Sequence, residues 1–300
     1  MDKKRRNVLR GLAIAPTLFA AHNLSASGNI DSSSQTRLQY SVNAYSFNSQ
    51  LRSGEMTFFE LMEFAAEIGL NAVDLTGYYF PSYPEIPPNS DLFQLKRRAL
   101  ELGLNISWTG IRNDFVNPDA DSRKMDRQMI KKWLQVSSNL GASIMRIFDG
   151  KHVYDGFTRD EVKKWLVEEF KLCAGYGEEN GVVLGLQNHN EFLLNSDEII
   201  DILKRVDSEW FGLILDIGSL SAADPYAEIE KLAPYANYWF IKEHVSPNGI
   251  QTSVDMKKIV SIIQNQGYQG YISFESLSDG DPKQIISSMF NAFRDEYEKL

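Results

Sequence analysis

The sequence has a single cysteine, Cys173, so the chain cannot form an internal disulfide. Cysteine usage therefore gives no information about the redox compartment in which the protein works. The four histidines are too few for a site that binds several metal ions. No Gly-x-Gly-x-x-Gly motif follows the first expected strand, which argues against a dinucleotide-binding fold.

Basic residues are in the minority, 31 Lys and Arg against 40 Asp and Glu, and several of them crowd the first ten positions. Loss of residues 1–27 would remove five basic residues and one acidic residue, and would change the formal net charge from −9 to −13. A body with this charge repels the phosphate backbone of nucleic acids. No nucleic acid partner is therefore expected.

The amino terminus has the features of an export signal. A basic head precedes an apolar run, Gly11–Ala21, which is too short to span a bilayer, and small residues follow it. The pair Arg5 and Arg6 resembles a twin-arginine signal, whereas a frayed basic terminus would not need the apolar run. We predict an export signal over residues 1–27, a disordered spacer over residues 28–37 and a periplasmic protein. Without a cysteine near the cleavage site, a lipoprotein anchor is excluded, so no membrane association is expected after signal removal.

The rest of the chain repeats one pattern, in which a helical stretch ends in glycine and an apolar run follows. Glycine ends a helix readily in the left-handed conformation, so each run is an expected strand. Capping motifs at Thr57, Thr158, Asp224 and Asp281 mark helix starts. Near-equal βα repeats favour a closed (β/α)8 TIM barrel, a single-domain α/β fold over residues 38–300, rather than a doubly wound sheet. The eight strands are predicted to begin near Tyr40, Ala72, Asn105, Ile144, Val182, Gly212, Tyr238 and Tyr271.

Several of these apolar runs end abruptly in strongly polar side chains. The run GVVLGLQNH ends in Gln187 and its two polar neighbours, FGLILD ends in Asp216, YWFIKEH ends around Lys242, and GYISFE ends in Glu275. An unpaired charge at the end of an apolar strand would be expensive, and the carboxyl ends of barrel strands share one opening. We therefore expect these side chains to meet at that opening.

The order of these motifs resembles the xylose isomerase-like TIM barrel family, which includes sugar isomerases, 3-epimerases and endonuclease IV-type enzymes. The resemblance covers roughly residues 38 to 297, as expected when a single barrel forms the whole domain. It rests on Asn113 to Pro118 after the third strand, Arg146, Gln187-Asn188-His189, Asp216-Ile217-Gly218, Lys242 and Glu275.

Members of that family hold a divalent metal through Glu, Asp, His and Glu at the ends of strands five to eight. The resemblance places Gln187, Asp216, Phe240 and Glu275 at these positions, and implies a site for Mn, Mg, Co or Zn held by Gln187, Asp216 and Glu275. Gln187 can offer an amide oxygen to a hard cation, but it has no charge and cannot act as a base. Phe240 has no lone pair. The ligand set is therefore atypical, and epimerisation by two bases is disfavoured.

Proton abstraction next to a carbonyl needs a base and a positive centre for the developing oxyanion. The sequence leaves two arrangements open. In the first, Glu275 or Asp216 is the base and Lys242 or His189 is the electrophile, so Glu275, Asp216 and Lys242 are the predicted catalytic residues. The second is a shifted metal site that recruits His189, His244 or Glu243.

Side chains around the same opening are candidates for substrate binding. Aromatic side chains pack against the apolar faces of sugar rings, although the aromatic loop that follows the second strand could equally pack against itself. Arg146 would either pair with Asp149 or bind a hydroxyl or carboxylate of the ligand. His189 would be a ligand contact or a structural histidine, and His244 fits an exposed loop as well as a binding role. The predicted substrate-binding residues are Asn43, Tyr45, Asp74, Tyr78, Trp108, Arg146, His189 and His244.

These observations predict a sugar isomerase or epimerase that acts on a carbohydrate or keto-sugar by proton transfer next to a carbonyl. The alternative is a non-catalytic carbohydrate-binding barrel that has lost its metal site. A nuclease of the endonuclease IV type is disfavoured by the acidic charge, the export signal and the scarcity of histidine. The sequence does not indicate an oligomeric state.

Overall fold

The computed structural model describes residues 37–151, 154–189 and 191–299. The predicted export signal lies outside these residues, as does the predicted spacer apart from Arg37. Within the described part, no helix combines the length and the apolar character that a membrane crossing needs.

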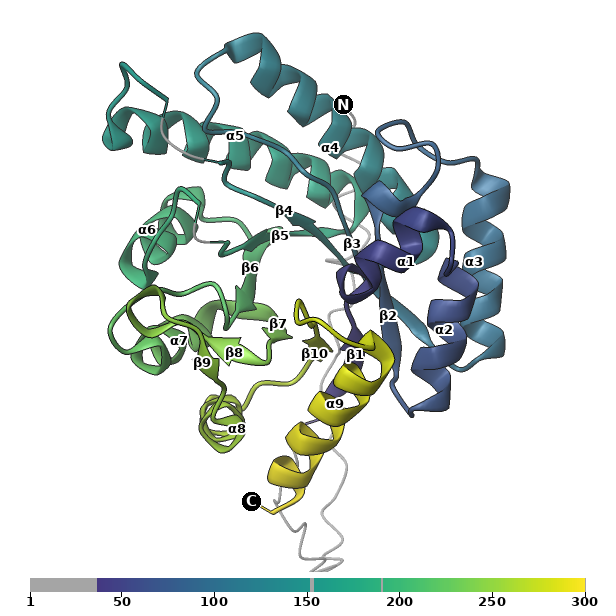
Figure 1. Ribbon diagram of the computed structural model, residues 1–300. Helices are drawn as coiled ribbons and strands as arrows, with labels where there is room; N and C mark the ends of the chain where they lie inside the picture. Colours follow the sequence, from purple (N-terminus) through teal and green to yellow (C-terminus); the bar gives the residue numbers. More distant parts are fainter. Residues whose placement is uncertain (1–36, 152–153, 190, 300) are drawn as a thin grey trace, which may run out of the picture. The chain divides into compact units, whose positions relative to one another are not determined.

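Parallel strands close into a barrel in the order β1-β2-β3-β4-β5-β6-β7-β10, as Figure 1 shows. The (β/α)8 prediction is confirmed, and each strand begins within two residues of its predicted start. The apolar runs of the sequence therefore do form the wall of the barrel. The strands are β1 Gln39–Val42, β2 Ala72–Thr76, β3 Asn105–Gly110, β4 Ile144–Ile147, β5 Val183–Gln187, β6 Phe211–Asp216, β7 Ala236–Ile241 and β10 Tyr271–Phe274.

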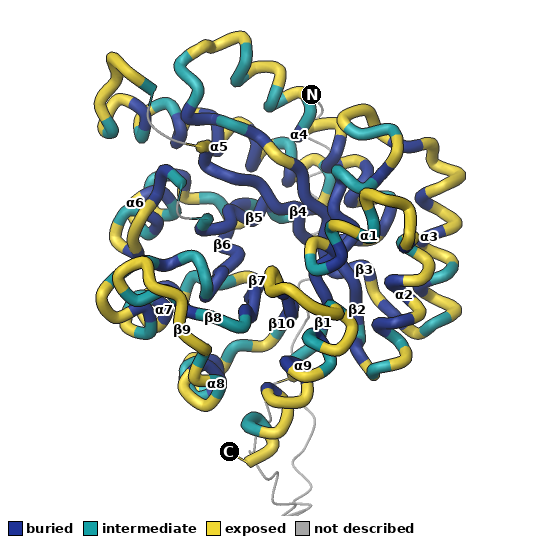
Figure 2. Tube along the Cα trace, in the orientation of Figure 1, coloured by how far each residue is buried: buried dark blue, intermediate teal, exposed yellow. Residues whose placement is uncertain are grey.

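Helices surround the strands, with buried inner faces and exposed outer faces (Figure 2). In α6 the buried Ile199, Ile202 and Val206 recur at helical spacing, which is why this segment packs as a helix against the barrel. The helices are α1 Asn48–Ser53, α2 Phe58–Glu67, α3 Asn89–Glu101, α4 Ala120–Leu140, α5 Arg159–Asn180, α6 Ser196–Val206, α7 Pro225–Leu232, α8 Met256–Asn265 and α9 Pro282–Glu298.

The predicted helix starts are confirmed. Thr57 and Thr158 each form a complete capping box with the glutamate three residues later, and Asp224 and Asp281 cap the helices that follow them. These caps satisfy backbone N–H groups that the first helical turn leaves without partners. The caps therefore define where these four helices begin.

A two-stranded hairpin, which the sequence reasoning did not predict, is inserted between β7 and α8. Its strands are β8 His244–Val245 and β9 Thr252–Ser253, and they pair antiparallel. The hairpin begins three residues after β7 ends, so His244 stays near the carboxyl end of the barrel.

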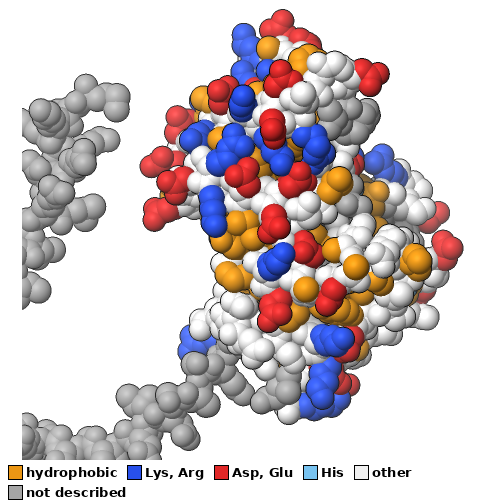
Figure 3. All heavy atoms as spheres, turned by 90° about the vertical axis from the view of Figure 1, so that its left-hand side faces the viewer, with side chains coloured by type: hydrophobic (Ala, Val, Ile, Leu, Met, Phe, Trp, Pro, Cys, Tyr) orange, Lys and Arg blue, Asp and Glu red, His pale blue; other side chains and the backbone are white. Residues whose placement is uncertain are grey.

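Charge on the outer surface is mixed in sign. On the face seen in Figure 3, Lys and Arg side chains alternate with Asp and Glu, and no broad area is basic alone. Ion pairs link neighbouring helices, such as Arg159 of α5 with Glu198 of α6 at 2.8 Å. Surface pairs of this kind contribute little to stability.

The barrel interior is filled by a small apolar cluster of Trp108, Ile144, Ile214, Tyr238 and Phe240. Because these side chains come from neighbouring and opposite strands, they close the floor beneath the strand ends. Any polar site must therefore lie above this layer, at the carboxyl ends of the strands.

Replacement of Gly185 by alanine is expected to destabilise the barrel. A Cβ atom there would lie 2.6 Å from Cγ1 of Ile214 and 2.9 Å from Cδ1 of Ile144, so the interior would be overpacked. The expected loss is about 1–3 kcal/mol in the free energy of unfolding, measured by urea denaturation. The matched control is Gly175→Ala in α5, where a Cβ atom has open space and alanine should gain up to about 1 kcal/mol. Equal stability of the two variants would contradict this account of the interior.

Candidate functional site

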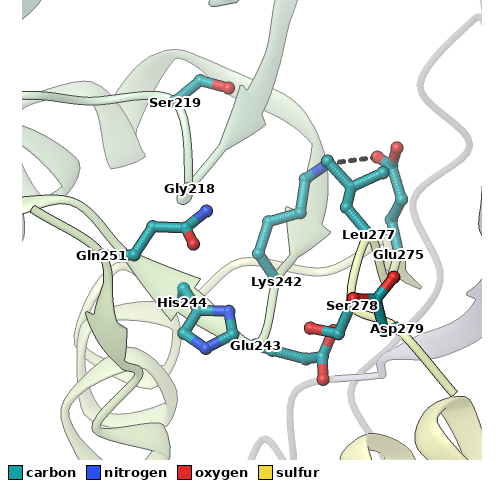
Figure 4. Close-up of a pocket in the computed structure, with 10 residues that line it drawn as sticks. All are labelled: Gly218, Ser219, Lys242, Glu243, His244, Gln251, Glu275, Leu277, Ser278 and Asp279. Atoms are coloured by element: carbon teal, nitrogen blue, oxygen red, sulfur yellow. Dashed lines mark hydrogen bonds and ion pairs between the residues drawn. The ribbon is translucent and has the colours of Figure 1, made fainter. Parts of the chain in front are cut away.

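A polar cavity of about 280 Å³ opens at the carboxyl ends of the barrel strands. Beside it lies an outer hollow of about 380 Å³, which Figure 4 shows. The cavity and the hollow share Lys242 and Glu275, so they form one continuous mouth. The cavity is lined by Asn43, Tyr45, Tyr78, Trp108, Arg112, Arg146, Phe148, Gln187, His189, Asp216, Ser219, Lys242, Glu275 and Leu277.

Lys242 bridges the two carboxylates of this mouth. It directly follows β7, and its Nζ lies 2.5 Å from Oε2 of Glu275 and 3.5 Å from Oδ2 of Asp216. Figure 4 shows the ammonium directed at Glu275. Asp216 at the end of β6 and Glu275 after β10 lie on either side of β7, and they thus share the cation that follows β7.

The ammonium form of Lys242 is stabilised by this environment. Burial alone would lower the pKa of Lys242, but the charges of Asp216 and Glu275 outweigh burial and raise the pKa above its ordinary value. Lys242 therefore stays protonated at neutral pH. A charged lysine can donate to an oxyanion, but it cannot act as a base or form a Schiff base.

Hydrogen bonds fix the side chain and the backbone of Asp216 in place. Its Oδ2 accepts a hydrogen bond from Nε2 of Gln187 at 2.8 Å, and its Oδ1 accepts one from the backbone N–H of Gly218 at 3.0 Å. Asn188 bonds both backbone groups of Asp216 at 2.8 Å. The fixed carboxylate in turn holds the Lys242 ammonium in place.

Glu275 keeps one oxygen free. Both of its hydrogen bonds, from Nδ2 of Asn43 at 3.0 Å and from Lys242, go to Oε2. No hydrogen bond among the described residues uses Oε1, although the side chain lines the cavity. Asn43 itself is fixed because its Oδ1 accepts the backbone N–H of Tyr45. Glu275 therefore presents an oriented carboxylate with an unused oxygen.

The side chains present do not fit the metal site that the family resemblance implies. A carboxylate only accepts hydrogen bonds, so Gln187 must turn its NH₂ group, rather than its oxygen, toward Asp216. Phe240 packs within the apolar cluster, 5.2 Å from the ring of Trp108. The described part of the chain contains no group of three His, Cys, Asp or Glu side chains that could hold a metal ion. The Lys242 ammonium lies where a cation shared by Asp216 and Glu275 would have to bind.

The predicted position of Asp74 at the rim is wrong. Asp74 is fully buried and does not line the cavity, because its Oδ2 accepts the backbone N–H of Ala44 and its Oδ1 accepts the hydroxyl of Thr76. Burial raises the pKa of Asp74 well above its usual value. Asp74 thus ties the end of β1 to β2 beneath the site.

Arg146 does not pair with Asp149. The guanidinium of Arg146 donates to the hydroxyl of Tyr78 at 3.1 Å, whereas Asp149 accepts the backbone N–H groups of Gly150 and Leu193. Burial raises the pKa of Asp149 to about 6. Of the two interpretations open at the sequence level, the internal ion pair is therefore excluded.

The two histidines occupy different parts of the mouth. His189 lines the cavity, and its ring packs edge-on against Phe148 with centroids 4.9 Å apart. His244, at the start of the β8–β9 hairpin, lines the outer hollow with Gln251 (Figure 4). The structure thus places both near Lys242 and Glu275, and their predicted role in substrate binding stays a prediction.

Of the aromatic loop, only Tyr78 lines the cavity. Tyr79 donates its hydroxyl to Asn48, and Phe80 and Tyr83 pack against Trp133 of α4. Most of the loop therefore packs against the protein itself. The sequence reasoning also missed lining residues with no distinctive motif, namely Arg112, Phe148, Ser219 and Leu277.

Comparison with known structures finds many similar barrels. D-psicose 3-epimerase from Clostridium cellulolyticum H10, solved with D-tagatose, matches 86% of this chain and 99% of its own, with 15% identity and a TM-score of 0.69. L-ribulose 3-epimerase matches 87% and 95%, with 17% identity and a TM-score of 0.71. The apo 3-keto-D-glucoside 4-epimerase from E. coli matches 87% and 99%, with 12% identity and a TM-score of 0.68. At these identities the similarity establishes the fold alone.

A search of curated protein sequences gives no match. The sequence profile described as the xylose isomerase-like TIM barrel, however, matches residues 62–296, which is most of the chain. The profile match, the closed barrel and the polar mouth at the strand ends agree, and this chain belongs to the xylose isomerase-like TIM barrel family.

Proposed function

We propose that this protein is a sugar isomerase or epimerase-like enzyme that moves a proton next to the carbonyl of a keto-sugar. The observation that carries the proposal is the Lys242 ammonium shared between Glu275 and Asp216 at the floor of the cavity. This arrangement supplies both parts that enolisation needs, a carboxylate base and a fixed positive charge.

In this mechanism Glu275 removes the proton through its unused Oε1. Lys242 gives a proton to the carbonyl oxygen, on which negative charge develops, and it recovers a proton from the neighbouring hydroxyl as that oxygen becomes the new carbonyl. Asp216 holds the ammonium in position. An oriented donor of this kind is worth about 10²–10³-fold in rate. Because Gln187 cannot act as a second base, the proton returns to the face from which it was removed. A single base therefore favours moving the carbonyl between adjacent carbons over inverting a carbon centre.

The test is exchange of carbon-bound hydrogen with deuterated water, followed by NMR over a panel of aldoses and ketoses. We expect exchange with at least one ketose, and we expect it to persist after treatment with a chelator. Exchange that appears only on addition of Mn, Mg, Co or Zn would replace the lysine mechanism by a metal-assisted one. Absence of exchange across the panel, with or without metal, would overturn the enzymatic proposal.

A non-catalytic carbohydrate-binding barrel is the second candidate. Gln187 and Phe240 favour it, since they replace groups that the family uses for metal binding, while Tyr45, Tyr78 and Trp108 keep aromatic surface at the mouth. Calorimetric binding of a sugar without hydrogen exchange would support this candidate. The proposal also includes export to the periplasm, which rests on the sequence of residues 1–27 and which cell fractionation would test.

A further inference from the structure

Arg146 is the most unusual charged side chain in the cavity. It projects from β4, is only 3% exposed, and lines the same cavity as Lys242 and Glu275. Of the guanidinium donors only Nη2 makes a hydrogen bond, to Tyr78, and the fully enclosed Nε has no partner. Nη1 has no partner among the described residues and is not among the fully enclosed polar atoms, so it is accessible from the cavity.

Aromatic rings surround the guanidinium. Its central carbon lies 4.1 Å from the ring centroid of Phe148, 5.5 Å from that of Trp108 and 5.6 Å from that of Tyr78. A Cβ atom at Gly110 would lie 2.7 Å from Nε, so glycine there leaves room for the arginine. Aromatic faces replace part of the lost hydration of a cation, but they accept no hydrogen bonds in the plane of the guanidinium.

No carboxylate of the described residues forms an ion pair with Arg146. Glu275 and Asp216 pair with Lys242, and Asp149 accepts backbone N–H groups. Arg112, the other arginine of the cavity, shows the contrast, because it pairs with Glu191 at 2.6 Å. A buried charge is costly unless it is paired and hydrogen-bonded, and a bound anion would supply the acceptors that Arg146 lacks.

We propose that Arg146 binds the carboxylate of an acidic sugar, and that uronates and related keto-acids are the substrate class of this cavity. The inference rests on the proposed function, since it places the carboxylate at Arg146 while the carbonyl contacts Lys242. A neutral hydroxyl would satisfy one donor of Arg146 but not its charge. A phosphate dianion would need a second free cation, and the other cations of the cavity, Lys242 and Arg112, already have counterions.

The test compares matched ligands on the full chain by calorimetry. Each series has a neutral ketose, the corresponding uronate and the 6-phosphate: D-fructose, D-fructuronate and D-fructose 6-phosphate, and likewise for D-tagatose. We expect the uronate to bind about ten- to hundredfold more tightly than the neutral sugar, as one charge-assisted hydrogen-bonded pair provides. Equal affinity for the neutral sugar and the uronate, or tighter binding of the phosphate, would overturn the inference.

Variants give a second readout. Arg146→Met should abolish the preference for the uronate, and Arg146→Lys should retain only part of it, because lysine lacks the planar fork. Arg159→Lys is the matched control, since Arg159 also stacks on an aromatic ring, Phe192, but already pairs with Glu198. If Arg146→Met fails to fold, the wild-type comparison of ligands still decides the question. A preference that survives in folded Arg146→Met would overturn the inference.

The two proposals fail in different ways. Tight uronate binding without hydrogen exchange would leave the Arg146 site standing and overturn the enzymatic function. Hydrogen exchange on neutral ketoses with no preference for uronates would leave the function standing and overturn the Arg146 site.

Discussion

Replacement of Lys242 by methionine is expected to lower hydrogen exchange at the sugar carbon by about 10²–10³-fold, because the oxyanion loses its fixed donor. Methionine is an unbranched side chain one heavy atom shorter than lysine, and it removes the ammonium with its charge and its hydrogen-bond donors. The rate is measured by NMR in deuterated water on a ketose that the wild-type protein exchanges. Unchanged exchange in the folded variant would remove Lys242 from the mechanism.

The same change should also destabilise the protein, because it leaves Asp216 and Glu275 as buried carboxylates without their cation. Loss of one partner of a buried ion pair costs about 3–5 kcal/mol. The difference in the free energy of unfolding between the variant and the wild type is measured by urea denaturation at neutral pH. In the wild type the raised pKa of Lys242 gives stability that is fully present at neutral pH and is lost only as the pH rises through that raised pKa.

The control for stability is Lys231→Met. Lys231 is half-exposed, and its Nζ lies 3.4 Å from Glu228 and 3.7 Å from Asp197. Such a surface pair is worth less than about 1 kcal/mol. If Lys231→Met and Lys242→Met lowered the free energy of unfolding by similar amounts, Lys242 would contribute no more to stability than a surface lysine.

The second large effect is expected for Glu275→Gln, which should lower hydrogen exchange by about 10²–10⁴-fold, the usual contribution of a positioned base. Glutamine keeps the shape, and its oxygen can still accept from Lys242 and Asn43, so the fold should survive. We expect the loss in kcat rather than in KM, because the substrate contacts remain. Exchange rates and calorimetric affinity on the same ketose separate these quantities.

Glu228→Gln is the matched control for this loss. Glu228 also accepts a backbone N–H, that of Ser196, and contacts a lysine, but it lies outside the cavity. Its replacement should leave exchange unchanged. A full rate in Glu275→Gln would move the role of the base to Asp216, which is the only other carboxylate among the described residues that line the cavity.

The sequence predicted the barrel and the location of its mouth because both depend on local patterns. Glycine stops and capping boxes fix where helices end and begin, and apolar runs between them become strands. The first polar residue after each apolar run marks the carboxyl end of a strand. Gln187, Asp216 and Glu275 mark three such ends, and they lie around one opening.

Contacts between side chains were less accessible to such reasoning. The bridge that Lys242 makes depends on the direction its side chain takes after β7, which no spacing encodes. Asp74 lies within β2, two residues before the strand ends, and it accepts a hydrogen bond from the backbone N–H of Ala44 instead of facing the cavity. The β8–β9 hairpin is too short to give a periodic signal.

Phe240 has a consequence for attempts to engineer this scaffold. It is packed on Trp108 and Tyr238 inside the barrel, so histidine there would place a polar ring in a dry hydrocarbon layer. Glutamate at position 187 would face Asp216 across a hydrogen bond that is 2.8 Å long. Conversion to a metalloenzyme therefore demands simultaneous redesign of positions 187, 240 and 242. Each single substitution would leave a buried charge or a buried polar group without a partner.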